Sequence, residues 1–346
     1  MALKIIENVS LTKYSTMRLG GFARFVANIK SRQDVVDAAA WAETRQLPLM
    51  MIGVGSNIVW GDKGYSGLIM INQIKGFKVF KEDDGNIYLT VGAGEVWDEV
   101  VKKAVKKGLS GIEALSLIPG TAGATPVQNV GAYGQDMSQI LVSVEAYDRK
   151  HNTFVIIPKV DCQFSYRDSR FKSADKGRFL ITGLTLHLKA THMKPPFYDS
   201  LQTYLDIHQI KQYDPATIRK AVIAVRSSRL PDPKKIANNG SFFANPIVDI
   251  PVFRSVISRY PGIPHWPQAD GRVKLSAAWM VELAGFKGFD DPETGMSVWP
   301  NQPLVLVNKK AKTTRQLIEF KQKIIVKVRY MFGVTLEQEP ELIGDL

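Results

Sequence analysis

Short glycine-rich turns between brief strands and helices dominate residues 15–135, and they constrain the fold more than any other feature of the chain. Two of these turns, Gly53–Asn57 and Gly120–Pro126, place glycines beside a serine or threonine hydroxyl. Glycine allows the main chain to approach a ligand closely, and successive N–H groups in such turns can bind an anion. Neither turn has the spacing of a dinucleotide-binding GxGxxG loop, and the second lacks the lysine of a P-loop. Either turn alone indicates only a tight turn, but both precede the polar segment Gln128–Gly134, and together they favour a bound phosphate group.

The composition predicts a protein without disulfides or a metal site. A length of 346 residues suggests two or three domains, at roughly 100–200 residues each. Cys162 is the single cysteine, which excludes an internal disulfide, and the spacing of the five histidines resembles no zinc or iron site. The chain has no apolar stretch of about 20 residues and no apolar signal core near its start. We therefore expect a cytoplasmic protein with no bound metal and no membrane partner.

The formal net charge of +12 has three interpretations. Lysines and arginines are spread along the chain, which is typical of a well-solvated surface. No helix-turn-helix, zinc finger or aromatic–basic pattern supports binding of nucleic acid. A small phosphate-bearing molecule is the remaining anionic partner, in agreement with the glycine turns.

Local signals predict alternating strands and helices. Ser31 and Asp34 have the spacing of a helix N-cap and its partner, and Gly108 stands where a left-handed residue would end a second helix. Asp214 followed by Pro215 is typical of a helix start. The predicted helices span residues 32–46, 96–107, 214–229, 275–283 and 314–330, and the predicted strands span 49–52, 58–60, 68–74, 87–91, 142–147, 154–157, 179–188 and 304–307.

Residues 191–214 differ from their surroundings, because Pro195 and Pro196 interrupt the pattern and three tyrosines alternate with polar residues. We expect this segment to be a loop and linker that leads into a further domain. The acidic tail, residues 334–346, is expected to be extended.

A series of longer motifs carries a resemblance to one known family. The motifs are Thr16–Gly21, Ile118–Gly134, Phe164–Phe171, Asn239–Pro246, Pro267–Gly271, Lys274–Trp279 and Gly285–Gly288. In this order they resemble the signatures of the UDP-N-acetylenolpyruvoylglucosamine reductase (MurB) family, and Ile118–Gly134 is similar to its flavin-site signature. Trp266 and Trp299–Pro300 depart from the family, which more usually has a tyrosine and a histidine-containing stretch there.

The resemblance implies an α+β flavoprotein with a fold of the vanillyl-alcohol-oxidase type. Two α/β subdomains, residues 1–70 and 71–205, would bind FAD. A C-terminal substrate-binding domain, residues 206–330, would follow, and the tail, residues 331–346, would return to the active site.

The resemblance further implies non-covalent FAD and NADPH as co-substrate. The reaction would reduce the enolpyruvyl ether of a UDP-amino sugar to UDP-N-acetylmuramate, and the enzyme is expected to be a monomer. The residues expected at FAD come from the glycine turns and the segment after them: Gly53, Gly55, Ser56, Asn57, Pro119, Gly120, Gly123, Ala124, Thr125, Gln128, Asn129, Gly131, Ala132, Tyr133 and Gly134.

Three residues are candidates for catalysis. Hydride addition to an enol ether conjugated with a carboxylate creates negative charge, so a cation or hydrogen-bond donor must lie where that charge develops. Arg167 could hold the carboxylate, although an arginine in this setting more often pairs with its neighbour Asp168. Ser241 is by default a turn residue or helix cap, and the resemblance makes it the proton donor to the enolate carbon. The family's ending selects Glu339 as the catalytic glutamate, with Glu337 as its rival.

Further residues match positions that bind the UDP-sugar or NADPH in the family. Tyr198 lies in a segment that resembles the mobile tyrosine loop of the family's first type, which closes over the substrate diphosphate. Without the resemblance it would be an ordinary exposed aromatic residue. Arg229 replaces a more usual lysine, which keeps the charge and changes its geometry. The remaining candidates are Tyr166, Asn245 and Gln302.

Two alternatives come from other functional classes. A flavin oxidase of the same fold would use oxygen in place of NADPH. Such oxidases frequently tether FAD through a histidine or cysteine, which residues 53–57 and 118–134 lack. A non-catalytic protein that binds anions or nucleic acid would account for the charge, and it would be colourless when purified.

Overall fold

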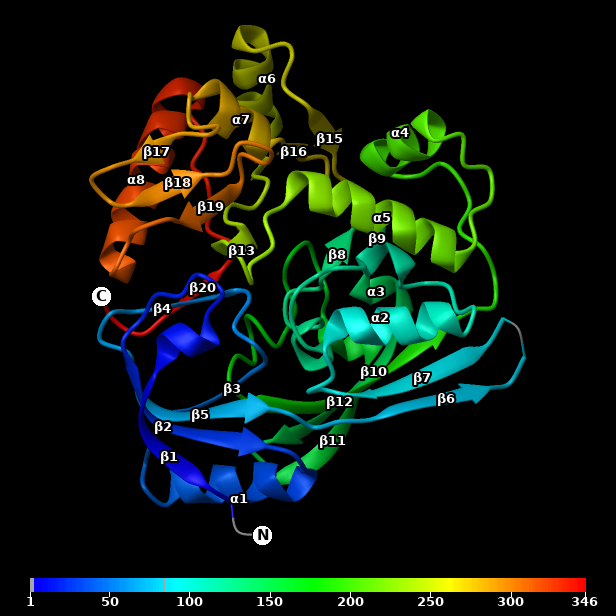
Figure 1. Ribbon diagram of the computed structural model, residues 1–346, viewed down its shortest axis with the longest axis vertical. Coiled ribbons are helices and arrows are strands. Elements are labelled where there is room, and N and C mark those ends of the chain that lie inside the picture. Colours follow the sequence, from blue (N-terminus) through cyan, green and yellow to red (C-terminus); the bar gives the residue numbers. More distant parts are fainter. Residues whose placement is uncertain (1–2, 84) are drawn as a thin grey trace. The chain divides into compact units, whose positions relative to one another are not determined.

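The computed structural model describes residues 3–83 and 85–346, and the chain divides into two compact units (Figure 1). The first unit is built mainly from Ala23–Val54 and Ser66–Ser227. The second unit contains Ser10–Phe22, Gly55–Tyr65 and Ser228–Leu346. The chain therefore leaves the first unit within the glycine turn at residues 53–57, so this turn contributes residues to both.

Two sheets form the frame of the first unit. One has the order β1-β2-β5-β3, in which β3 and β5 are parallel. The other has the order β11-β10-β12-β7-β6 and is antiparallel. The strands are β1 (Ile5–Ser10), β2 (Phe22–Ile29), β3 (Leu49–Ile52), β5 (Tyr65–Asn72), β6 (Phe77–Lys81), β7 (Ile87–Gly92), β10 (Leu141–Asp148), β11 (Thr153–Pro158) and β12 (Phe179–Leu188).

Helix α1 (Arg32–Glu43) covers the first of these sheets (Figure 1). The Ser31 hydroxyl accepts a hydrogen bond from the amide of Asp34, and the Asp34 carboxylate accepts one from the amide of Ser31. This capping box confirms the predicted helix start. The buried alanines and Val35 of α1 pack on apolar residues of β2, β3 and β5, which gives this sheet its core.

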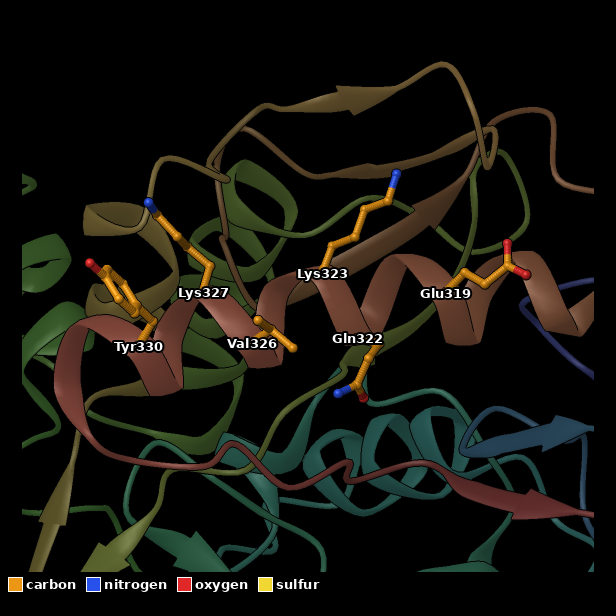
Figure 2. A pocket seen from close by; sticks show the side chains of 6 residues that line it. All are labelled: Glu319, Gln322, Lys323, Val326, Lys327 and Tyr330. Atoms are coloured by element: carbon orange, nitrogen blue, oxygen red, sulfur yellow. The ribbon is translucent and has the colours of Figure 1, made fainter.

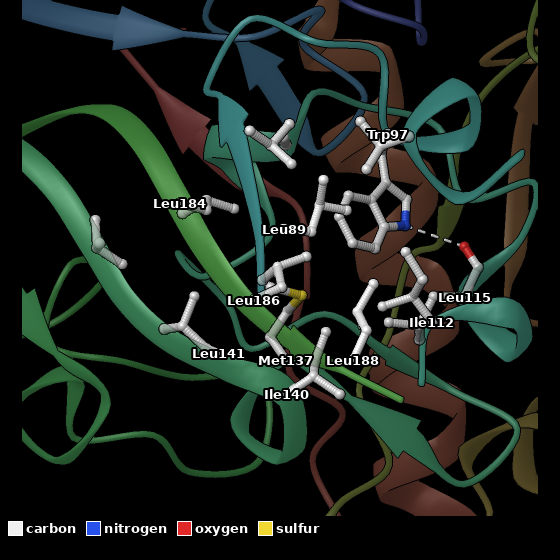
Figure 3. Close-up of a cluster of buried hydrophobic side chains, with 14 of the residues drawn as sticks. Leu89, Trp97, Ile112, Leu115, Met137, Ile140, Leu141, Leu184, Leu186 and Leu188 are labelled. Atoms are coloured by element: carbon white, nitrogen blue, oxygen red, sulfur yellow. Dashed lines mark hydrogen bonds between the residues drawn. The ribbon is translucent and has the colours of Figure 1, made fainter. Parts of the chain in front are cut away.

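Helix α2 (Trp97–Lys106) covers the second sheet, and its Trp97 lies fully buried among strand leucines (Figure 3). The Trp97 Nε1–H donates to the carbonyl of Leu115 at 3.1 Å. This bond ties α2 to the chain just before the segment 118–134. Gly108 follows the helix with a φ of 72°, as predicted for a left-handed helix end.

The expectation of a loop over residues 191–214 is wrong, because Asp199–Ile207 forms helix α4. Leu201 and Leu205 are four residues apart, so they share one face of this helix, and both are fully buried. That face packs on helix α5 (Pro215–Arg229). The prolines mark only the chain before α4.

Helix α5 begins where the sequence predicted. The Asp214 carboxylate accepts hydrogen bonds from the amides of Ala216 and Thr217, both at 3.0 Å. These bonds satisfy amides that have no partner within the first turn of the helix.

The second unit is organised around the long helix α8 (Thr314–Phe332), whose apolar face packs with α7 and the strands of a small sheet. The sheet order is β13-β19-β18-β17, beside a three-stranded sheet β14-β16-β15 and the parallel pair β20-β4. The elements are β4 (Ile58–Trp60), β13 (Ala237–Ser241), β14 (Ile247–Val248), α6 (Ile250–Arg259), β15 (His265–Pro267), β16 (Val273–Leu275), α7 (Ala277–Leu283), β17 (Asp290–Asp291), β18 (Met296–Val298), β19 (Val305–Asn308) and β20 (Glu341–Ile343).

Short elements complete the chain. They are η1 (Leu11–Tyr14), η2 (Glu113–Leu115), η3 (Ala122–Ala124), β8 (Gly131–Ala132), β9 (Gln135–Asp136), α3 (Met137–Ile140) and η4 (Lys159–Cys162). Within the described residues, no helix is long and apolar enough to cross a lipid bilayer.

Apart from α4, each predicted helix and strand lies within a few residues of an observed element. The first unit thus contains two sheets, each covered by a helix. Most of α5, up to Ser227, belongs to the first unit, and residues 55–65 belong to the second.

Candidate active site

The two glycine turns approach each other within the first unit. A Cβ atom added to Gly53 would lie 2.3 Å from Oγ1 of Thr121, which leaves no room for a side chain at position 53. Thr121 is itself buried. Glycine at position 53 is therefore required for this close approach.

The amides of the second glycine turn donate within the protein. The amides of Ala122 and Gly123 bond to the carbonyls of Glu95 and Ala93, each at 2.8 Å. The amides of Ala124 and Thr125 bond back into the same turn. The idea that these successive N–H groups form an anion site is therefore wrong for residues 122–125. The second glycine turn therefore contributes its compact shape and its close contact with the first turn.

The segment after the turn contacts the 164–171 motif through the side chain of Asn129. The Asn129 amide group donates to the carbonyl of Ser165 at 3.2 Å, and its Oδ1 accepts from the amide of Ser138 at 3.0 Å. Asn129 and Tyr133 both have a positive φ, near 50°. The two predicted motifs therefore meet in space.

Arg167 lies against this segment, because its Nη2 donates to the carbonyl of Gly131 at 3.1 Å. Its guanidinium also lies 5.4 Å from the centre of the Tyr166 ring. The carboxylate of Asp168 accepts from the hydroxyl of Ser173 at 2.6 Å. Arg167 thus contacts the predicted flavin segment through Gly131.

Tyr198, the residue immediately before α4, reaches the same segment. Its ring meets the ring of Tyr133 edge to face, with centroids 5.8 Å apart, and half of Tyr198 remains exposed. Tyr133 also packs on the α4–α5 apolar cluster. The candidate tyrosine loop and the candidate flavin segment are therefore neighbours.

Sequence reasoning missed Arg226, which is on α5. Its side chain is hydrogen-bonded to Tyr133, and burial lowers the pKa of its guanidinium. The sequence signal that could have identified Arg226 is its position as a basic residue on the inward-facing side of the predicted helix, beside Val222 and Val225, which are both buried.

In the second unit, the tail returns to Ser241. The amide of Glu339 donates to the carbonyl of Phe242 at 2.9 Å, and the amide of Ala244 donates to the carbonyl of Glu337 at 3.0 Å. This register puts Glu339 opposite the neighbour of Ser241, whereas Glu337 lies farther along and is exposed. Phe242 is fully buried in the core of the unit, so it anchors the turn that presents Ser241.

The first glycine turn, residues 53–57, also contacts the tail near Glu339. The Asn57 amide group donates to the carbonyl of Glu339 at 3.5 Å, and the Asn57 carbonyl accepts from the amide of Glu341 at 2.9 Å. The strands β4 and β20 continue this contact in parallel. Asn57, Glu339 and the Ser241 turn are thus assembled in one unit.

The remaining candidates are distributed over the second unit. The Asn245 Oδ1 accepts from the amide of Ala277 at 2.9 Å, so this side chain holds the start of α7. Gln302 forms the turn before β19, and Ser241 pairs with Val305 of that strand. Arg229 is the exposed last residue of α5. An open hollow on α8, lined by Lys323, Lys327 and Tyr330 among others, contains none of the predicted site residues (Figure 2).

Two family profiles match separate parts of the chain. The profile of the FAD binding domain matches residues 23–154. The profile of the UDP-N-acetylenolpyruvoylglucosamine reductase C-terminal domain matches residues 232–343.

Whole-length relatives carry the same name. UDP-N-acetylenolpyruvoylglucosamine reductase from Ralstonia nicotianae is 39% identical over 96% of this chain and 97% of its own. The reductase from Pseudomonas aeruginosa is 36% identical over 99% of this chain and all of its own, and that from Neisseria gonorrhoeae is 37% identical over 95% of each.

A solved structure shares the fold. The crystal structure of MurB from Thermus caldophilus aligns over 99% of this chain and 100% of its own with a TM-score of 0.66, at 21% identity. This likeness confirms the expected α+β arrangement of an FAD-binding part and a C-terminal domain. By the identity and coverage of its relatives, this chain belongs to the UDP-N-acetylenolpyruvoylglucosamine reductase (MurB) family.

Proposed function

We propose that this chain reduces UDP-N-acetyl-3-O-(1-carboxyvinyl)-glucosamine to UDP-N-acetylmuramate, with NADPH as reductant and FAD as a non-covalent cofactor. The reaction belongs to the synthesis of peptidoglycan precursors. The observation that carries the proposal is the strand register that brings Glu339 and Asn57 to the Ser241 turn.

The residues of the first unit fit a flavin nucleotide. Gly53 and Thr121 leave no space for a larger residue at position 53, so the two turns lie directly against each other. Residues 128–134 follow and are polar and partly buried. We propose that the residues of 53–57 and 118–134 named in the sequence analysis hold FAD, which when bound accepts two electrons from NADPH and delivers them as hydride.

The protein must then stabilise the negative charge that hydride addition creates and supply a proton to the substrate. Hydride adds to the terminal carbon of the enolpyruvyl group, the carbon–carbon double bond breaks, and the electron pair moves toward the carboxylate as an enolate. The Arg167 guanidinium would bind that carboxylate and stabilise the charge where it develops. Its Nη2 donates to the carbonyl of Gly131, in the segment proposed to bind FAD.

Ser241 would donate the proton to the carbon next to the carboxylate. Its place after the left-handed Gly240 (φ 71°) and before the buried Phe242 fixes the main chain that carries the hydroxyl. A serine is a weak acid, but an enolate is a strong base. The half-buried Glu339 is favoured over Glu337 as the supporting carboxylate, because only Glu339 is opposite the Ser241 turn.

The substrate would be held by the remaining candidate residues. Tyr198 and Tyr166 of the first unit, and Arg229, Asn245 and Gln302 of the second, are the proposed contacts to the UDP-sugar or to NADPH. We propose further that the enzyme is a cytoplasmic monomer that binds neither nucleic acid nor a membrane.

The test is the Ser241→Ala variant, followed by stopped-flow absorbance of the flavin. NADPH should still reduce the flavin at a near-normal rate, because that step needs no proton from serine. Reoxidation by the UDP-sugar should be slower by about 10²–10⁴-fold, the usual worth of a positioned general acid. Ser241→Cys should recover part of this rate, since a thiol can also donate a proton. Reoxidation of Ser241→Ala within a few-fold of wild type would show that Ser241 is only a turn residue.

A second pair of variants decides between the two glutamates. Glu339→Gln should slow reoxidation by the UDP-sugar, whereas Glu337→Gln, an exposed residue two positions away, serves as the matched control. The opposite result would assign the role to Glu337.

A further inference from the structure

The buried side chain of Asn239 joins three separate segments of the second unit. Its Nδ2 lies 3.1 Å from Oγ1 of Thr16, 3.2 Å from the carbonyl oxygen of Ser56 and 3.3 Å from that of Ile58. Only 6% of Asn239 is exposed. One amide group thus holds the main chain on both sides of Asn57.

The orientation of this amide is determined by its surroundings. If the group were turned over, its oxygen would face two carbonyl oxygens, which is repulsive. In the observed orientation Oδ1 is buried and has no hydrogen-bond partner among the residues that the structure describes. A buried acceptor of this kind lowers stability. The protein therefore keeps the contacts of Nδ2 at the expense of Oδ1.

Thr16 completes the arrangement. Its hydroxyl donates to the Ser56 carbonyl at 3.4 Å, its amide donates to the Gly55 carbonyl at 3.3 Å, and its own carbonyl accepts from the amide of Asn238 at 3.0 Å. The glycine turn is therefore connected to β13 through Thr16 as well as directly through Asn239. Ser241 is two residues beyond Asn239 on the same strand.

We propose that Asn239 is a positioning residue. Together with Thr16 it keeps residues 55–58, which are the end of the first glycine turn and the residue after it and are called the cofactor turn below, in a fixed arrangement with the proton donor Ser241. This inference rests on the proposed roles of the turn in FAD binding and of Ser241 in proton transfer. Asn239 contacts neither reacting atom in this scheme. It acts through the main chain of the turn and through its own strand.

The first test measures FAD affinity of apoprotein by quenching of FAD fluorescence. Asn239→Ala should weaken FAD binding by roughly tenfold, the effect of about one net hydrogen bond. Asn239→Asp, which has nearly the same shape, should weaken it further, because a carboxylate would face the carbonyls of Ser56 and Ile58. A space-filling role predicts the reverse order, with Asp close to wild type.

Asn238→Ala is the matched control. Asn238 is similarly buried, but its side-chain hydrogen bonds within residues 3–83 and 85–346 are to Pro231, Ile236 and Gly240, which are close to it in sequence. It should lower thermal stability with little loss of FAD affinity. Equal effects of the two alanine variants on FAD affinity would overturn the proposal.

The second test compares the half-reactions at saturating FAD. Asn239→Ala should slow flavin reoxidation by the UDP-sugar more than reduction by NADPH, because only the former uses Ser241. If Asn239→Ala slowed flavin reduction and flavin reoxidation by the same factor relative to wild type, a positioning role would be contradicted.

Thr16→Val keeps the test decisive if Asn239 variants do not fold, since it removes only one hydroxyl. It should weaken FAD binding in the same direction, and in the double variant with Asn239→Ala the losses should not add. An unchanged affinity in Thr16→Val would count against the proposal. Asn57→Ala distinguishes the proposed FAD-binding role of the turn from the proposed positioning role of Asn239. If Asn57→Ala leaves FAD affinity unchanged, the FAD-binding role of the turn is refuted, independently of the result for the Asn239 variants.

Discussion

Replacement of Gly53 by alanine tests whether the contact between the two glycine turns is needed for FAD. The added Cβ would lie 2.3 Å from Oγ1 of Thr121 and 3.2 Å from its Cβ and Cγ2. Ordinary contact starts near 3.4 Å. Thr121 is buried and branched at Cβ, so the two turns must separate by about 1 Å.

The expected loss of FAD affinity in Gly53→Ala follows from the free-energy cost of this overpacking, typically about 1–3 kcal/mol. Apoprotein can relieve the strain by letting the turns move apart, but FAD binding requires them in their original places. The strain therefore appears in the binding free energy. At 1.4 kcal/mol for each tenfold change, FAD should bind about 5- to 150-fold more weakly.

The assay is titration of apoprotein with FAD, monitored by fluorescence. Thr121→Ala in the same chain removes Oγ1, the closest atom, and Cγ2, so the double variant should recover most of the affinity. Gly76→Ala is the matched control, because the Cβ added there would be 3.6 Å from its nearest neighbour. Wild-type affinity in Gly53→Ala, or no recovery in the double variant, would refute the reasoning.

The remaining predictions concern chemistry, binding, pH and reactivity. Arg167→Ala should abolish flavin reoxidation by the UDP-sugar while NADPH reduction continues; stopped-flow traces in which both halves fall equally would instead indicate a structural role. Tyr198→Phe should mainly raise the apparent KM for the UDP-sugar, and steady-state data with a large fall in kcat at unchanged KM would contradict this. Burial disfavours the charged form of Asp98, but its hydrogen bonds with Arg219 (Nη1–Oδ1 2.6 Å) and the Leu117 amide outweigh this and lower its pKa. Its stabilisation is therefore present above about pH 4, the unfolded value, and is lost as the pH falls through the lower folded pKa. Asp98→Asn should accordingly reduce the free energy of unfolding by about 2 kcal/mol at pH 7, and urea titrations showing the same deficit below the folded pKa would contradict it. Burial raises the pKa of the Cys162 thiol to about 11, so the native protein should react with a thiol reagent at pH 8 only after unfolding; rapid labelling of native protein would show that the site opens.

Local signals in the sequence were sufficient for most element boundaries. The Ser31–Asp34 pair, the Asp214 cap and Gly108 each act over a few residues, so their effect is the same whatever packs around them. The long motifs likewise identified the family and its chemistry without any coordinates. Helix α4 was missed because the prolines before it conceal a short helix whose stability comes from packing on α5.

Only the tertiary structure decided how the candidate residues are used. It showed that the amides of 122–125 donate to carbonyls of 93–95 and of their own turn, which no pattern of glycines reveals. It placed Glu339 nearer to Ser241 than Glu337, because strand register depends on pairing between segments about a hundred residues apart. It also brought Asn239, Thr16 and the cofactor turn together. Capping and turn formation depend on neighbours along the chain, whereas register, burial and hydrogen bonds between distant segments exist only once the chain has folded.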